Sequence, residues 1–163
     1  MAKEYPLEQV TRIKQRRLED AEKVLQEKKK VLEQEQEKLK KAHQELEKIQ
    51  THKEDKLAQL RHELDTQPNP TKIQQMKVYL KEVDNKVQAQ KHKVTEQEKK
   101  IDIAEKAVEA ARQDMFKKQQ AVEKMHLHKK EWSKEEKKIE TKKEADLMDE
   151  VGTTIFTKRS RHE

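Results

Sequence analysis

The chain has 163 residues, of which 44% are charged and only 31% hydrophobic, and its formal net charge is +6. Globular domains are usually about 45–50% apolar, so this chain cannot bury a broad core; it is either disordered or built from long helices that share a narrow apolar seam. One glycine and no cysteine exclude a glycine-rich phosphate loop, a disulfide framework and a thiolate metal site.

The first predicted element is a helical arm over residues 1–64. Its leucines recur every seven residues, and the row consists of Leu18, Leu25, Leu32, Leu39, Leu46 and Leu60, interrupted only by Lys53. A sustained seven-residue period predicts an α-helix that supercoils in a left-handed sense against a partner helix. Since a disordered chain has no reason to keep such a phase, the pattern favours the helical alternative.

A proline-rich turn is predicted at residues 65–71, which read DTQPNPT. Pro68 and Pro70 stop the first helix, because each proline fixes φ and restricts the residue before it. Thr71 is the expected cap of the helix that follows. A connection of seven residues is typical of two neighbouring antiparallel helices.

The second predicted helical arm covers residues 72–150. Its apolar row consists of Ile73, Leu80, Val87, Val94, Ile101, Val108, Met115 and Val122, with a companion row three residues on that includes Met76, Val83, Ala104, Ala111, Met125, Trp132 and Ile139. Gln90 and Gln97 interrupt the companion row and are expected across from residues 39–46. Such polar seam residues specify the helix register, are simply exposed on a thin coil, or mark a flexible middle. Further on the seam fades, and residues 151–163 are expected to form a flexible basic tail.

These arms predict an all-α fold, a long antiparallel two-helix coiled-coil hairpin whose second helix is longer than the first. With a rise of about 1.5 Å per residue and a turn near residue 68, positions face each other when their numbers add up to about 136. Leu7 is therefore expected near Lys129. Trp132 then lies at the open end, where we expect a hydrophobic clasp with Tyr5 and its neighbours, or alternatively a partner contact.

The titratable residues form no pattern typical of catalysis. His126 and His128 are two residues apart and point to different helix faces, whereas metal pairs on a helix need a spacing of three or four. Carboxylates lie on a surface without a cleft that could exclude water. We therefore expect no enzyme activity, no bound metal and no cofactor.

Two classes of partner are also not expected. Basic and acidic residues are interleaved, as in EKKKVLEQEQEKLKK at 27–41, and the few aromatics offer no stacking platform, so no nucleic-acid site is expected. No apolar run approaches the roughly 20 residues of a membrane span, so no membrane insertion is expected.

An outward-facing patch is predicted close to the turn. Met76 and Leu80 occupy the seam, whereas Val78 and Tyr79 face outward or flank it. A tyrosine beside an apolar residue is unusual on so charged a surface. A partner-binding role and simple packing against the flank of the seam both remain open.

The chain opens on Tyr5-Pro6-Leu7-Glu8, followed by Val10, Ile13-Lys14 and Arg17, and this opening resembles that of type III secretion stalk proteins, the YscO/FliJ family. The segments AEKVLQEKKKVLEQEQEKL (21–39), MKVYLKEV (76–83) and HLHKKEW (126–132) are most similar to chlamydial members of that family. The resemblance extends over nearly the whole chain, to about residue 150.

The resemblance implies a non-catalytic coiled coil, similar to the rotor coil of rotary ATPases, seated in the pore of a hexameric secretion ATPase that it stimulates or organises. It further implies contacts with the export-gate cytoplasmic ring, secretion chaperones and a needle-length regulator, a cytoplasmic location at the base of the secretion apparatus on the inner membrane, and a role in virulence. The residues expected to make these contacts are Tyr5, Leu7, Ile13, Arg17 and Trp132 at the open end, which would enter the ATPase ring, and Met76, Tyr79, Leu80 and Val83 near the turn, which would meet the export gate.

An alternative function is a structural coiled-coil rod or tether that homodimerises through parallel helices. The hairpin would be a monomer about 120 Å long, whereas an extended parallel dimer would exceed about 200 Å. Scattering with a mass determination separates these two predictions.

Overall fold

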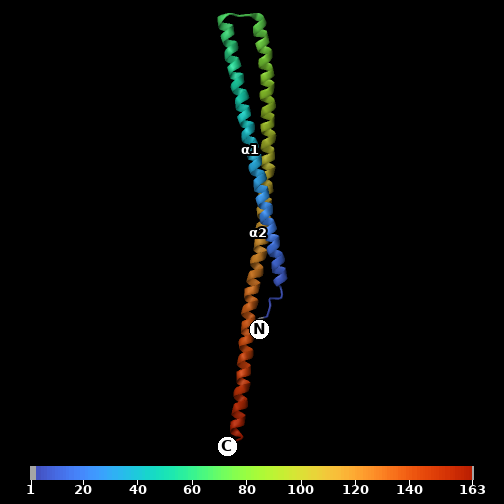
Figure 1. The fold of residues 1–163 in the computed structure, drawn as a ribbon, viewed down its shortest axis with the longest axis vertical. Helices are drawn as coiled ribbons and strands as arrows, with labels where there is room; N and C mark the ends of the chain where they lie inside the picture. Colours follow the sequence, from blue (N-terminus) through green and yellow to red (C-terminus); the bar gives the residue numbers. More distant parts are fainter. Residues whose placement is uncertain (1–2, 163) are drawn as a thin grey trace. The chain divides into compact units, whose positions relative to one another are not determined.

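The computed structural model describes residues 3–162, which form two α-helices and no β-strand (Figure 1). Helix α1 spans Glu8–Thr66 and helix α2 spans Pro70–Ser160, so α2 is the longer, with 91 residues against 59. The two helices run in opposite directions and lie against each other. The predicted all-α hairpin with a longer second helix is confirmed.

Contacts divide the chain into two units, each made of one stretch of α1 and one stretch of α2. The first unit combines the residues up to Glu22 with those from Asp114 onward. The second unit, Lys23–Gln113, contains the connection between the helices.

The connection in the second unit is short, because only Gln67, Pro68 and Asn69 lie outside the helices. Asn69 is the cap of α2: its Oδ1 accepts a hydrogen bond from the backbone N–H of Thr71 at 3.1 Å. Pro70 takes the first helical position, where a missing N–H costs nothing. The expected cap, Thr71, is therefore wrong by two residues, since asparagine before proline already satisfies the first turn.

Apolar side chains of the predicted heptad rows form the seam of the second unit. Its buried apolar residues are Leu25 of α1 and Val83, Val87, Val94, Ala104 and Val108 of α2. A two-helix seam covers only the positions that face the partner helix, so Val24 and Val31, one residue before the leucine row, stay exposed.

Two glutamines of α2 form hydrogen bonds across this seam, which favours the register interpretation among the alternatives above. The side-chain amide of Gln90 donates to the carbonyl oxygen of Ala42 at 3.0 Å, and that of Gln97 donates to the carbonyl oxygen of Glu35 at 3.0 Å. Ala42 lies within the predicted stretch 39–46, whereas Glu35 lies about one helical turn before it. Each of these carbonyl oxygens lies within α1 and has a second lone pair that can accept from the glutamine N–H. A shifted register would leave these buried or half-buried side-chain amides without a hydrogen-bond partner.

The first unit packs the start of α1 against a later part of α2. Its buried residues are Tyr5, Thr11, Leu18 and Ala21 on the N-terminal side and Val122 and Met125 of α2. Glu8 pairs with Lys129 at 2.8 Å, one position from the predicted neighbours Leu7 and Lys129. Beyond Glu136, which pairs with Lys3 at 3.7 Å, each described residue from Lys137 to His162 is exposed.

The end of α2 differs from the sequence-based expectation. The sequence predicts a helix end near Val151, but α2 continues through Gly152 to Ser160. Gly152 has no positive φ, so it does not form a left-handed helix cap. A single glycine costs a helix only about 1 kcal/mol, so the helix persists through Gly152.

Candidate interaction surfaces

The described residues include exposed apolar surfaces, but no metal-binding cluster and no membrane-spanning stretch. Across residues 3–162, no group of three or more His, Asp or Glu side chains is arranged to hold a metal ion. Neither helix, over the same residues, contains a stretch apolar and long enough to cross a membrane. Three surfaces in the two units combine exposed apolar groups with defined contacts.

The first surface is the open end, which we define as Tyr5–Arg17 together with Lys129–Ile139. Tyr5 is only 5% exposed, and its ring lies 5.4 Å from that of Trp132, centroid to centroid, in a tilted arrangement. The Tyr5 hydroxyl and Nδ1 of His128 form a hydrogen bond. The predicted clasp between Tyr5 and Trp132 is confirmed. His128, one helical turn before Trp132 on α2, also contacts Tyr5.

A turn at the chain start holds Tyr5 in this position. The N–H of Glu8 donates to the carbonyl of Tyr5 at 3.1 Å, with Pro6 at the second position, where its fixed φ favours a turn. Lys129 then reaches over the Tyr5 ring, at 5.9 Å from its centroid, to bond Glu8. The hydrogen bond from Lys129 lowers the pKa of Glu8 below its ordinary value of 4.5.

The outer side of the open end is apolar and basic. Val10, Ile13 and Arg17 follow one another at spacings of three and four, so they share one face of α1. Leu7 lies in the turn just before the helix, and all four residues are exposed. The run QVTRIKQRRL, residues 9–18, holds four basic residues and no acidic one. A partner that offers carboxylates around an apolar hollow would complement this face.

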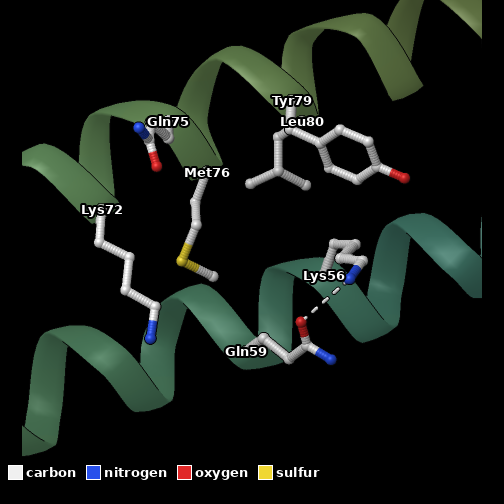
Figure 2. A pocket seen from close by; sticks show the side chains of 7 residues that line it. All are labelled: Lys56, Gln59, Lys72, Gln75, Met76, Tyr79 and Leu80. Atoms are coloured by element: carbon white, nitrogen blue, oxygen red, sulfur yellow. Dashed lines mark hydrogen bonds between the residues drawn. The ribbon is translucent and has the colours of Figure 1, made fainter.

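The second surface is a pocket of about 280 Å³ close to the connection (Figure 2). It is lined by Lys56, Gln59, Lys72, Gln75, Met76, Tyr79 and Leu80. Met76 points from α2 toward α1. On the α1 side, the Nζ of Lys56 donates to Oε1 of Gln59 at 3.2 Å. Lys56 of α1 lies three residues after Lys53, which interrupts the leucine row, so the α1 side of this pocket has lysines where the rest of that row has leucines.

Tyr79 stands at the edge of this pocket and is held from α1. His52 lies edge-on to the Tyr79 ring, and its Nε2 is 2.7 Å from the Tyr79 hydroxyl. Lys56 Nζ lies 5.6 Å from the ring centroid. Tyr79 remains exposed, so its fixed orientation presents an aromatic edge to solvent.

The third surface is a groove of about 270 Å³ in the middle of the second unit, which the sequence-based predictions do not include. Exposed Val31 and Ile103 line it with Ala104 and Ala107, and Lys28 and Lys100 also line it. A signal for it is present in the sequence, because Ile103 and Val31 are apolar residues outside the heptad rows.

The sequence-predicted contact residues divide into three groups. Leu7, Ile13 and Arg17 at the open end and Tyr79 near the connection are exposed. Tyr5 and Val83 are buried, Val83 with only 2% exposed, and they serve the packing between α1 and α2. Met76 and Trp132 are half-buried, with part of each side chain on the surface. His52 and His128, both absent from the predicted set, fix the two tyrosines.

Comparison with known proteins gives two agreeing matches. The YscO-like protein family model matches residues 2–162. The solved structure of CT670 from Chlamydia trachomatis, described as a YscO homologue, is 36% identical to this chain. It superposes with a TM-score of 0.91, over 99% of this chain and 100% of that one. No curated protein sequence matches the chain.

Proposed function

The chain belongs to the YscO-like family, and from this premise we propose that it is the non-catalytic central stalk of a type III secretion ATPase. The family makes it a protein related to type III secretion. The stalk role is a further step, since fold alone does not specify a function. We assign the ATPase contact to the open end.

The observation that carries this proposal is the clasped open end. Tyr5, Trp132 and the pair Glu8–Lys129 fasten the start of α1 to α2. The fastening leaves the face of Ile13 and Arg17 exposed and holds it in a fixed orientation. A fixed apolar and basic face can favour one subunit conformation in a surrounding ring over others, which is what a stalk must do.

The proposal includes further contacts of the same apparatus. Tyr79, held by His52 beside the pocket, supports a contact with the export-gate cytoplasmic ring. The groove at Val31 and Ile103 offers an apolar surface for secretion chaperones and the needle-length regulator. We place the protein in the cytoplasm at the base of the apparatus, where one copy acts as the stalk.

The test measures ATP hydrolysis by the cognate hexameric ATPase as the purified protein is titrated in. Wild type is expected to raise the rate, and the double variant I13D/R17E is expected to lose at least about tenfold in apparent affinity, because an apolar contact and a charge contact are both reversed. The matched control V24D/K23E makes the same kinds of change at two exposed positions outside the open end. Unchanged hydrolysis with wild type, or equal loss in both variants, would overturn the proposal.

A further inference from the structure

The C-terminal end of α2 carries a stripe of large apolar side chains that nothing in the described chain covers. The stripe consists of Leu147, Met148, Val151, Ile155 and Phe156, which are between 52% and 74% exposed. Met148, Val151 and Ile155 follow at spacings of three and four, with Leu147 beside them, so these four share one helix face. The stripe lies in the part of α2 drawn in red in Figure 1, which has no neighbouring helix.

This stripe is not a continuation of the seam between α1 and α2. The heptad row that passes through Trp132 and Ile139 continues at Asp146 and Thr153, which are polar. The apolar residues instead stand at Met148 and Val151, on a different side of the helix. A second seam, directed at another partner, therefore begins in this segment.

The charges along the stripe are separated into two halves. Residues 144–150 hold four acidic residues and no basic one, whereas residues 151–161 hold three basic residues and no acidic one. Glu144 and Lys158 lie on the stripe face itself, four residues before Met148 and three after Ile155. The ion pairs of the described residues end at Glu136, so the structure pairs none of these charges within the chain.

Such a pattern is complementary to itself when one copy is reversed. Two copies that cross antiparallel near Val151 place each acidic half against the partner's basic half and the two apolar stripes against each other. A parallel arrangement would set like charges side by side. An anionic membrane surface would be repelled by the acidic half. Gly152 lies in open space, since even a Cβ at this position would meet nothing within 4 Å, and its lack of a side chain lets the two backbones approach at the crossing point.

We propose that residues 144–161 of α2 bind the same segment of a second copy of this chain, forming an antiparallel two-helix dimer. The segment is about 27 Å long, which limits the interface to the small class of weak, transient contacts. The monomer expected from the sequence is therefore the state of the dilute protein and of the single copy that acts as a stalk. This dimer does not depend on the ATPase contact, because the open end lies outside residues 144–161.

Sedimentation equilibrium from about 5 to 500 µM tests the association. The average mass is expected to rise from 19.5 kDa toward twice that value. Variants D146K/D149K/E150K and K158E/R159E/R161E should each weaken self-association at least tenfold, because like charges then face each other across both ends of the interface. An equimolar mixture of the two variants should form a heterodimer at least as well as wild type.

A matched control reverses three exposed basic residues far from the segment, in K86E/K91E/K93E, and should leave the association unchanged. Circular dichroism on every variant checks that the helix persists. A constant mass of one chain at all concentrations would overturn the proposal, as would a mixture of the two charge variants that fails to associate.

The absence of cysteine allows a direct test of direction. In an antiparallel dimer crossing at Val151, the variant Val151→Cys should form a disulfide-linked dimer on mild oxidation. Lys158→Cys, on the same helix face as Val151, should not, because its two copies then lie about 21 Å apart. Cross-linking of Lys158→Cys would instead show the parallel arrangement and overturn the proposal.

Discussion

The open end and the turn-proximal region, defined as Lys53–Leu80, are built from the same two helices but pack differently. At the open end Tyr5 is buried against Trp132. In the turn-proximal region no residue is buried, and a pocket lies between Met76 and Lys56. Lys53, Lys56 and Glu63 occupy seam positions of α1 there. The heptad period alone therefore pairs the helices, whereas the residue types at its positions decide how tightly they close.

The largest expected effect compares the two tyrosines. Tyr5→Ala should lower the free energy of unfolding by about 3 kcal/mol, since it removes a buried ring and leaves a cavity beside Trp132. Tyr79→Ala should cost about 0.5 kcal/mol, because the ring is largely on the surface. Trp132→Ala should resemble Tyr5→Ala. Urea denaturation measures the loss of stability in each variant, and hydrogen exchange over residues 8–18 localises the loss expected for Tyr5→Ala. Equal losses of stability at the two tyrosines would remove the distinction between the regions.

The second expected effect makes the turn-proximal region resemble the open end. The double variant K53L/K56L fills the seam with leucines and should raise stability by about 1–2 kcal/mol. Hydrogen exchange in residues 53–80 should slow accordingly. The control K40L/K41L introduces leucines at exposed positions outside the seam and should have little effect. If both variants stabilise the protein equally, lysines in the seam are not the cause of the loose packing.

A smaller effect isolates the hydroxyl of Tyr5. Tyr5→Phe keeps the ring against Trp132 but removes the hydrogen bond to His128, and should cost about 1 kcal/mol. His128→Phe should cost a similar amount, and the double variant should cost less than the two single losses added together. Strict additivity in this thermal or urea denaturation cycle would show that the hydroxyl and the imidazole do not interact.

The smallest effect is a dependence of stability on acid. The pKa of Glu8 is lowered by the hydrogen bond from Lys129, and that of Glu35 by the hydrogen bond from Gln97 and then that from Lys38. A lowered folded-state pKa means that the stabilisation is complete above the ordinary value of 4.5 and is lost as pH falls below it.

Substituting the hydrogen-bond partner of each carboxylate separates the contributions of the two units to the loss of stability at low pH. In Lys129→Met, the protection of residues 8–18 from hydrogen exchange should decline less steeply below pH 4.5, with no change in the other unit. Gln97→Leu should flatten it in the second unit only. Both carboxylates are half-buried beside solvent, so each change should be small. A steeper decline in either variant would contradict the assigned cause.

The helices and their register could be predicted from the sequence because a seven-residue period repeated through both arms leaves no other phase. The same arithmetic places Trp132 beside Tyr5 and Gln90 opposite Ala42. The cap at Asn69 and the helical state of Gly152 could not be predicted, since each depends on about 1 kcal/mol between local alternatives.

The interaction surfaces were less predictable than the fold. Burial of Val83 follows from its heptad position, and only the family resemblance places it among the expected contact residues. The contacts of His52 with Tyr79 and of His128 with Tyr5 join side chains at the edge of the seam, where the period carries no information about rotamers. The groove at Ile103 depends on the positions of both helices at once.

The central claim is that the open end of this chain works inside the pore of a secretion ATPase. An electron cryomicroscopy map of the chain bound to its cognate hexameric ATPase tests it most directly. We expect density in the pore that fits residues 3–22 together with 114–139, with Ile13 and Arg17 against the ring. An empty pore, or pore density that fits the connection at Pro68 instead, would contradict the account.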